Sequence, residues 1–518
     1  MNKGPLTQLP LALRNVGNAT LQKQVFEQIR SMIVDGRLRA GAALPATREL
    51  SSQMGISRNT AVLAYERLIS EGYIYTRPHV GTFVAATIPE ETFATKRPTE
   101  LLDGASNTSS NGVELKRRHH APDKVHNLRS PHRRKLKYDF WVGRPDPSSF
   151  PTKTWAKHIA RRLQTPGVGM TEYGDPAGLR ELRTAIAAHL GPARGISADP
   201  DQVIIVGGCQ DGFNLIARML VGEGSPVVVE NPCFQGAAYV MDSYGGVLHP
   251  VPVDDDGLIV ANLPQASNGI VYVTPSHQYP MGVTMSLQRR LSLLGWANRT
   301  DAYIIEDDYD SDFRFTGSTL TALKGLDLAD RVIYMGTFSK CLGPGLRLGY
   351  IVVPSALSEP ARRLKSLMNN GQSWLEQAAL ADFMMEGGYR RHLRRVRQIY
   401  LSRRDALLHA LKKNFGTCDV RGEDAGMHLV WKIPDGMPRA AELEERALEH
   451  KIGVYALSTG AALHFGPSED DQGHLVLGYA ALTPQEIAHG ISTLAQVIKT
   501  KPRSEKPKPL PNQNEARR

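Results

Sequence analysis

Apolar residues near the start of the chain recur at helical spacing. Four of them lie at intervals of four positions: Leu21, Val25, Ile29 and Ile33. This spacing predicts an amphipathic helix that stops at Gly36. A shorter helix is expected from Thr47, as its N-cap, to Met54, and Gly55 would end it.

The next stretch predicts a third helix and a hairpin. Ser57 is placed to cap the helix RNTAVLAYERLISEG, which begins at Arg58. Its apolar face is expected to comprise four residues: Val62, Tyr65, Leu68 and Ile69. Two β-rich runs, GYIYTR and GTFVAA, follow and are joined by PHV. Two helices, a tight turn, a third helix and a hairpin are typical of a winged helix-turn-helix, whose third helix enters the DNA major groove.

From about Trp141 onward, short β-branched runs alternate with helical stretches. The runs are VIIV (203–206), PVVV (226–229), GIVYVT (269–274), AYIIED (302–307), RVIYMG (331–336) and GYIVVP (349–354). Such runs predict an α/β fold with a mostly parallel sheet and helices on both faces. Ligands bind outside the carboxyl ends of the strands in such sheets, so the informative residues should follow the runs directly.

Two segments lack this periodicity. Residues 96–137 are rich in Ser, Asn, Pro and charge and predict a flexible linker, and residues 499–518 predict a disordered, proline-rich tail. The expected organisation is therefore a winged-helix domain over 1–95, the linker over 96–137, a larger domain over 138–498 and the tail over 499–518.

Charge supports this division. The chain carries a net charge of +10, but residues 1–84 hold +5, the linker +7 and the tail +5, so the remainder is mildly acidic. A basic front segment indicates a polyanionic partner such as double-stranded DNA. Solvated basic segments without any partner are an equally good explanation of the charge alone.

Composition excludes several classes of protein. No stretch reaches the roughly 18 apolar residues that a membrane span needs. The N-terminus has no apolar signal region. The four cysteines are scattered without a CxxC pair, which argues against a disulfide framework or a zinc cluster and fits a reducing cytoplasm.

The residues that follow the runs carry candidate chemistry. A glycine turn comprising Gly208, Cys209 and Gln210 opens a helix after VIIV, where free N–H groups suit a phosphate. Asp307, Asp308 and Tyr309 follow AYIIE. Thr337, Ser339 and Lys340 follow RVIYMG, with Arg347 seven residues later. Lys340 is either a surface lysine or an amine that forms an imine with an aldehyde cofactor.

Together these residues make pyridoxal 5′-phosphate the natural candidate cofactor. It needs an amine, an acid near its pyridine nitrogen, a donor at its phenolic oxygen, a phosphate cup and a stacking surface. The candidates are Lys340, Asp307, Tyr309, the glycine turn with Arg347, Thr337 and Ser339, and Phe234.

The front segment resembles the DNA-binding domain of GntR-type bacterial repressors. The resemblance rests on Leu44-Pro45, Arg48-Glu49-Leu50, the Gly-x-Ser-Arg turn, Glu71-Gly72-Tyr73 and Gly81-Thr82-Phe83-Val84, which occur in order. It implies DNA contacts from Arg48, Ser57, Arg58, Asn59 and Thr60, and from His79 and Gly81 at the wing tip. Surface arginines paired with Glu49 or Glu66 are the alternative.

Residues from about 140 to 498 resemble a fold-type I aminotransferase domain with a smaller C-terminal α+β subdomain. The motifs are TEYGDPAGLRELRTAIA, VENPCFQGA, TPSHQYPMG, IIEDDYDSDFRF and GTFSKCLGPGLRLGY. A GntR-type domain ahead of such a domain is similar to MocR-type regulators, the group that contains the GABA, taurine and pyridoxine-synthesis regulators. The resemblance implies a homodimer in which Lys340 forms the imine, Asp307 pairs with the pyridine nitrogen, Tyr309 faces O3′, Phe234 stacks on the ring and Tyr173 reaches the phosphate of the other subunit.

Two departures from the aminotransferase pattern stand out. Tyr279-Pro280-Met281-Gly282 replaces the frequent Asn-Pro-Thr-Gly, and Tyr279 is included among the expected cofactor contacts. The late strand HLVLGYAAL contains no arginine for a substrate carboxylate. Arg421, Arg439 or Arg446 are possible substitutes.

These features favour a transcriptional regulator that is not an enzyme and that senses pyridoxal phosphate, an amine or an amino acid at Lys340. A working aminotransferase with an accessory DNA-binding domain is the alternative, and a DNA-binding protein with a purely structural second domain is a third hypothesis.

Overall fold

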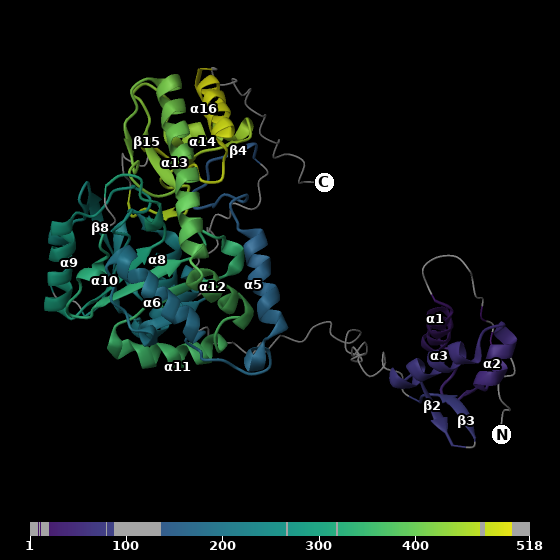
Figure 1. Ribbon diagram of the computed structural model, residues 1–518. Helices are drawn as coiled ribbons and strands as arrows, with labels where there is room; N and C mark the ends of the chain where they lie inside the picture. The colour runs from purple at the N-terminus through teal and green to yellow at the C-terminus, as the bar shows by residue number, and fades with distance from the viewer. Residues whose placement is uncertain are drawn as a thin grey trace, which may run out of the picture. The chain divides into compact units, whose positions relative to one another are not determined.

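The computed structural model describes residues 9, 11, 20–78, 80–86, 136–265, 268–317, 320–466 and 472–499. These residues belong to two units, divided between Leu115 and Lys116 (Figure 1). Almost all of the expected linker and tail, and also His79, lie outside the described residues.

The first unit is the expected winged helix-turn-helix. Its helices are α1 (Leu21–Val34), α2 (Thr47–Met54) and α3 (Arg58–Ser70), and its strands are β1 (Ala43–Leu44), β2 (Ile74–Arg77) and β3 (Gly81–Val84). The hairpin β2–β3 is confirmed, and β1 adds a third strand in the order β1-β3-β2, which the sequence analysis missed. The core lies between α1 and α3, where Val25, Phe26 and Ile29 are fully buried.

Two local predictions in this unit were wrong. Thr47 is the first residue of α2 and makes no side-chain cap, because the N-cap is Ala46. The buried face of α3 contains Ala61 and Ala64 beside Tyr65 and Leu68, whereas Ile69 is exposed and Val62 half-buried. Small residues at these positions allow α1 and α3 to approach closely, which apolar periodicity alone does not reveal.

The second unit is built around an eight-stranded sheet in the order β5-β13-β12-β11-β10-β6-β8-β9. The strands are β5 (Val203–Val206), β13 (Gly349–Val352), β12 (Val332–Thr337), β11 (Tyr303–Asp308), β10 (Ile270–Val273), β6 (Pro226–Asn231), β8 (Val247–Asp254) and β9 (Gly257–Leu258). All six runs predicted from the sequence form strands of this sheet, and the sheet is mostly parallel.

The last of those runs departs from the parallel expectation. Strand β13 lies antiparallel between β12 and β5. The chain joins β12 to β13 through residues 338–348, which contain one short 3₁₀ turn, Pro344–Leu346. A parallel return would need a longer crossover, so the strand reverses direction.

Helices cover both faces of the sheet (Figure 1). On one face pack α7 (Cys209–Leu220), α8 (Gln235–Ser243) and α11 (Ser358–Asn369). On the other face lie α6 (Arg180–Arg194), α9 (Leu287–Thr300), α10 (Leu323–Leu326) and α12 (Trp374–Met385), with α5 (Thr152–Gln164) against α12. Alternate residues of each strand face opposite sides, so both layers bury apolar side chains.

The long helix α13 (Gly388–Phe415) leads into a smaller α+β subdomain (Figure 1). Its sheet has the order β14-β15-β19-β17 and comprises β14 (Val420–Arg421), β15 (His428–Lys432), β19 (His474–Gly478) and β17 (Tyr455–Ala456), with α14 (Ala440–Glu449) and α16 (Pro484–Lys499). Two small pairings tie distant segments together: β16 (Ile452–Gly453) with β4 (Tyr138–Asp139), and β18 (Ala462–Leu463) with β7 (Cys233–Phe234). Within the described ranges, no helix is long and apolar enough to cross a membrane.

Candidate functional site

A cavity of about 280 Å³ opens at the carboxyl ends of the central strands. Every predicted cofactor residue except Gly208 and Tyr173 lines it: Cys209, Gln210, Phe234, Tyr279, Asp307, Tyr309, Thr337, Ser339, Lys340 and Arg347. These residues come from positions scattered over the sequence, and the sheet gathers them because strands β5, β6, β10, β11 and β12 end at one edge.

Lys340 follows β12 and projects its amine into this cavity. Nζ of Lys340 donates to the backbone carbonyl of Gly143, with 3.1 Å between the two atoms. The Gly143 carbonyl is neutral, so this hydrogen bond does not tie the Lys340 amine into an ion pair. Lys365, another buried lysine of this domain, lies 2.5 Å from Oδ2 of Asp211 and is committed to that ion pair.

Gly143 limits the space around that amine. Its φ is +79°, and a Cβ added there would lie 2.6 Å from Nζ of Lys340. We expect Gly143→Ala to lower cofactor affinity at least about tenfold, because both strain and crowding oppose the side chain. Equilibrium titration with pyridoxal phosphate measures this. The control is Gly473→Ala, where the added Cβ meets nothing within 4 Å. An equal loss of pyridoxal phosphate affinity in both variants would contradict the expectation.

Asp307 is the penultimate residue of β11 and is almost completely buried. Its Oδ2 accepts a hydrogen bond from the hydroxyl of Tyr272 at 2.9 Å, whereas Oδ1 has no partner among the described residues. Burial is the main cause that raises the pKa of this carboxyl to about 7. An orphaned carboxylate oxygen at a cavity wall fits a protonated ring nitrogen, which would supply the missing donor.

The neighbouring Asp308 has a different task. Its Oδ2 lies 2.7 Å from Nε of Arg194 and accepts the hydroxyl of Tyr334 at 2.6 Å. Consecutive strand residues face opposite sides of the sheet, so Asp307 reaches the cavity and Asp308 the interior. A buried carboxylate needs a cationic partner, and Asp308 has one in Arg194.

The glycine turn and Arg347 form a cup for an anion. Helix α7 begins at Cys209, and its N–H groups at Cys209 and Gln210 precede the first hydrogen bond to the Gly208 carbonyl, which Asp211 makes. A Cβ added to Gly208, whose φ is +103°, would lie 3.2 Å from Nη1 of Arg347. A positive helix end and a guanidinium side by side fit a phosphate, with the hydroxyls of Thr337 and Ser339 on the same wall.

The half-buried carboxylate of Asp211 holds this turn in place. Oδ2 of Asp211 accepts from the N–H of Gly207 at 2.7 Å, from Nζ of Lys365 and from Nε2 of Gln372 at 3.0 Å. Burial raises the pKa of the Cys209 thiol to about 12, so this cavity residue is a neutral thiol.

Aromatic rings enclose the remaining space. The ring of Phe234 meets that of Tyr279 edge-on with centroids 5.9 Å apart, and Tyr279 meets Tyr309 in the same way at 6.2 Å. The Tyr309 hydroxyl donates to the carbonyl oxygen of His277 at 3.0 Å.

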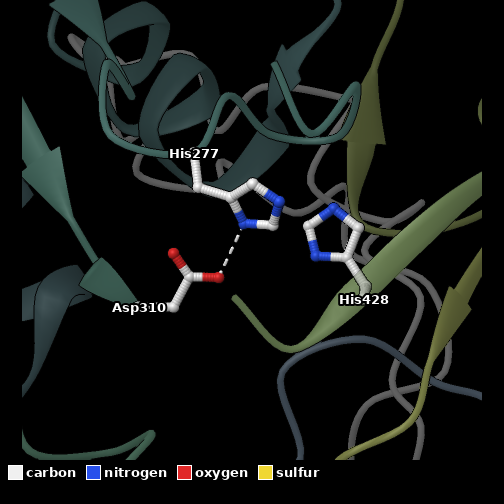
Figure 2. A group of neighbouring side chains, drawn as sticks. All are labelled: His277, Asp310 and His428. Carbon is white, nitrogen blue, oxygen red and sulfur yellow. Dashed lines mark hydrogen bonds and ion pairs between the residues drawn. The ribbon is translucent and has the colours of Figure 1, made fainter. Parts of the chain in front are cut away.

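Behind Tyr309 lies a buried group of three side chains, His277, Asp310 and His428 (Figure 2). Nδ1 of His277 is 2.8 Å from Oδ2 of Asp310. A carboxylate only accepts, so Nδ1 carries the proton and the ring is fixed in place. Histidine and aspartate are ligand types for a metal ion. However, Gly426 packs so closely that a Cβ there would lie 2.2 Å from Nδ1 of His277, and this close packing favours the direct hydrogen bond between His277 and Asp310. We assign this group to the support of Tyr309.

Tyr173 does not line the cavity of the single chain. Tyr173 is 91% exposed in the single chain, and its expected role across a dimer stays a prediction.

The sequence analysis missed the donor Tyr272 and the wall residues Trp141, Val142, Gly143, Thr274 and Ala461. Tyr272 and Thr274 lie at the carboxyl end of a predicted strand, which is a signal that could have identified them, whereas the others come from distant loops and carry no such signal.

The first unit presents the expected DNA-contacting residues on its surface. Ser57 caps α3 by accepting from the N–H of Thr60 at 3.1 Å, as predicted, and Arg58 and Asn59 are exposed in the first turn. Arg48 is exposed on α2. Ion pairs of Arg48 or Arg58 with Glu49 or Glu66, the alternative explanation, do not occur among the described residues of this unit.

The wing is described in part. Gly81 begins β3 with a φ of +143°, a conformation that favours glycine. The guanidinium of Arg77 stacks over the rings of Tyr75 and Phe83 at 5.4 and 5.5 Å, which holds a cation beside the wing. The expected contact from His79 lies outside the described residues.

Comparison with known families gives two matches. Residues 141–494 match aminotransferase class I and II, and residues 21–84 match the bacterial regulatory proteins of the gntR family. The chain is 36% identical to the probable rhizopine catabolism regulatory protein MocR of Rhizobium meliloti, over 93% of this chain and 95% of that protein. It is 30% identical to the pyridoxine biosynthesis transcriptional regulator PdxR of Corynebacterium glutamicum, over 90% and 96% of the two chains.

A solved structure supports the fold of the second unit. The α-aminoadipate aminotransferase LysN of Thermus thermophilus, complexed with N-(5′-phosphopyridoxyl)-L-leucine, matches with a TM-score of 0.64 and 28% identity. The match covers 73% of this chain and 97% of that one.

Proposed function

Because the chain belongs to the MocR-type transcriptional regulators, we propose that it holds pyridoxal 5′-phosphate at Lys340. We further propose that its affinity for operator DNA changes when a small molecule binds at that site. The observation that carries the proposal is one cavity with a lysine amine held only by a backbone carbonyl, an orphaned carboxylate oxygen on Asp307 and an anion cup at Gly208 and Arg347.

Each side chain has a separate task in this proposal. Asp307, oriented by Tyr272, keeps a proton on the ring nitrogen, and Tyr309 faces the phenolic oxygen. Arg347, the first turn of α7, Thr337 and Ser339 hold the phosphate, while Phe234 covers the ring. When bound, the cofactor supplies an aldehyde that reacts reversibly with primary amines. The amine of Lys340 would hold the cofactor at that aldehyde.

DNA binding is assigned to the winged helix. Arg58, Asn59 and Thr60 at the start of α3 would meet base edges or phosphates in the major groove, and Arg48 would hold the backbone. A signal molecule shifts the balance between two arrangements of the regulator only if it binds one of them better. We assign dimerisation to the aminotransferase-like domain, with Tyr173 reaching the second copy.

The proposed organisation keeps the boundaries expected from the sequence, with a DNA-binding domain over 1–95, a linker over 96–137, the cofactor domain over 138–498 and a tail beyond. Relatives of this chain are named as regulators, and we propose that it is a regulator without enzymatic turnover. Incubation with an amino donor and a keto acid should give no steady product, and sustained turnover would support the aminotransferase alternative.

The function is tested by titrating the purified protein with pyridoxal phosphate while following visible absorbance and operator binding together. We expect a visible imine band and a change in operator affinity on addition of an effector amine. Absence of the band would refute the cofactor assignment, and a band without any effect on operator binding would refute the sensor.

Replacing Arg58 by alanine should reduce operator affinity about tenfold or more, since one arginine contact to DNA contributes roughly 1–3 kcal/mol. The cofactor band should be unchanged, because the substitution lies in the other unit. The control is Lys23→Ala, which removes an exposed cation from α1. Unchanged operator binding of the Arg58 variant at near-physiological salt would contradict the assignment of α3.

A further inference from the structure

Helix α13 is strongly basic, although the domain around it is mildly acidic. Nine of its 28 residues are lysine or arginine, and Asp405 is its one acidic residue. The segment from Gly388 to Arg404 contains seven arginines and no acidic side chain. Such a concentration of one sign of charge indicates a polyanionic partner, unless the fold itself uses the charges.

The fold uses two of these arginines. Arg403 is buried, and its Nη2 lies 3.0 Å from Oδ2 of Asp146. Nη2 of Arg404 lies 2.7 Å from Oδ1 of Asp405, and its guanidinium covers the ring of Phe315. Structural tasks therefore account for the arginines in the middle of α13.

The other five arginines have no such task. They form what we call the arginine face: Arg390, Arg391, Arg394, Arg395 and Arg397. Four of them are exposed and Arg397 is half-buried. Arg391 donates to the backbone carbonyl of Glu386 at 3.3 Å, and Arg395 donates to that of Ser149. None of the five forms an ion pair with a carboxylate in the part of the chain that the structure describes.

The placement of the arginine face opposes the stability of its own helix. Arg390 and Arg394 are four residues apart, as are Arg391 and Arg395, so like charges are neighbours on the helix surface. Arg390 and Arg391 also lie in the first turn, where the positive end of the helix dipole disfavours cations. Helix stability therefore does not explain these residues.

Helix α5 is tied to the first half of α13. Nη1 of Arg161, near the end of α5, lies 2.7 Å from Oε1 of Glu386, which precedes α13. At the other end of α5, Arg395 of α13 donates to the carbonyl of Ser149. The two helices thus run antiparallel beside the arginine face.

Helix α5 adds positive charge and leaves no carboxylate free for the arginine face. Lys153 and Lys157 are exposed on it, and neither forms an ion pair among the described residues. The carboxylates of Asp382 and Glu386 are both engaged by arginines of α5. The surface beside the first half of α13 therefore keeps an excess of positive charge.

A second copy of this chain is not a suitable cover for the arginine face. Burying cations without carboxylate partners is costly, and the chain offers a better dimer contact elsewhere. Leu163, Val168 and Met170 are exposed apolar residues that lie close in sequence to Tyr173, which we assign to the dimer contact.

We therefore propose that the arginine face contacts the phosphate backbone of DNA, which gives the cofactor domain a DNA contact of its own. Guanidinium groups bind phosphates through charge-assisted hydrogen bonds, and such contacts read no sequence. At about 1.5 Å per residue, Arg390 to Arg397 span roughly 10 Å of helix, and one DNA strand presents a phosphate about every 3.4 Å of its axis.

DNA is the favoured polyanion because the same chain carries a winged helix. DNA held by that domain is present at high local concentration for every other basic surface of the chain. This inference rests on the proposed function, since it requires that the winged helix binds DNA.

The test measures how the DNA affinity of the full-length protein depends on salt. The probe is a fluorescein-labelled duplex of arbitrary sequence, about 40 base pairs long, titrated at about 50 to 200 mM KCl. Arg390→Ala/Arg394→Ala removes two charges of the arginine face. The control, Lys412→Ala/Lys413→Ala, removes two exposed charges from the far end of the same helix.

We expect the arginine double variant to bind at least about tenfold more weakly near 100 mM KCl. The slope of log affinity against log salt should become shallower by at least about 1.8, because each lost phosphate contact contributes about 0.9. The lysine control should keep both the affinity and the slope.

The outcomes separate this contact from the function on which it rests. An unchanged slope in the arginine variant, or an equal change in the lysine control, would overturn the contact alone. Unchanged DNA binding together with weaker binding of poly-L-glutamate would assign the face to an acidic protein and would also overturn it. If the unaltered protein bound no duplex, both the contact and the proposed DNA-binding function would be refuted.

Folding and assembly are measured on the same samples. Because the substituted arginines repel each other and the helix end, the double variant should melt no lower than the unaltered protein and should sediment as the same species. A lower melting temperature or a changed oligomeric state would mean that these arginines support the fold or the dimer. Arg390→Lys/Arg394→Lys keeps the charge and should keep the salt slope, and a lost slope in that variant would contradict a phosphate contact.

Discussion

Lys340→Ala should abolish the visible imine band of the holoprotein completely. The reason is covalent: Nζ of Lys340 is the amine that projects into the cavity beside Asp307 and Arg347, and alanine removes it. Borohydride reduction followed by peptide mapping should find a pyridoxyl group on Lys340 in the unaltered protein and none in the variant. Operator binding by the winged helix should survive in the absence of effector.

Two lysines serve as references for this experiment. Lys153 is exposed on α5, and Lys153→Ala should leave the band intact. Lys365 is buried near the anion cup, but its ion pair with Asp211 keeps its amine from reacting. A pyridoxyl adduct on Lys365, or a band that persists in Lys340→Ala, would show that the assignment of the reactive lysine is wrong.

Asp307→Asn should weaken cofactor binding by at least about 100-fold. Loss of one member of a buried ion pair costs roughly 3–5 kcal/mol, and each 1.4 kcal/mol is a factor of ten. The asparagine has nearly the same shape and still accepts the Tyr272 hydroxyl, so the change concerns charge. Fluorescence titration of the apoprotein with pyridoxal phosphate measures the affinity.

The same substitution should not destabilise the apoprotein. Burial raises the pKa of Asp307 to about 7, so its contribution to stability is fully present below the unfolded pKa near 3.8 and is lost as the pH rises through 7. The asparagine cannot ionise, so the variant does not lose this stability. At pH 8 it should unfold at the same denaturant concentration as the unaltered protein, or at a higher one. A large drop in apoprotein stability would mean that Asp307 is a structural residue, and the weaker cofactor binding would then have another cause.

Local pattern gave good predictions where neighbouring residues decide the structure. The runs at 269–274, 302–307 and 331–336 form central strands because runs rich in β-branched residues suit a sheet covered on both faces. Lys340 and Asp307 follow such runs directly, so their approach to one cavity was foreseeable from the rule that parallel strands end at one edge. The cap formed by Ser57 is likewise a local event.

Local pattern failed where packing partners decide. The apolar face of α3 was misjudged at Ile69, because contact with α1 selects Ala61 and Ala64 instead. The direction of β13 depends on the short path from β12, which hydrophobic runs do not encode.

The sequence by itself determined the two kinds of domain, their order and the chemistry of the residues after the strands, because these follow from short-range periodicity and side-chain type. Only the tertiary structure decided what surrounds that chemistry. The carbonyl of Gly143 that holds Lys340 and the orphaned Oδ1 of Asp307 both depend on segments far apart along the chain. Desolvation and partner choice depend on every atom within a few ångströms, and those atoms are brought together by folding rather than by sequence proximity.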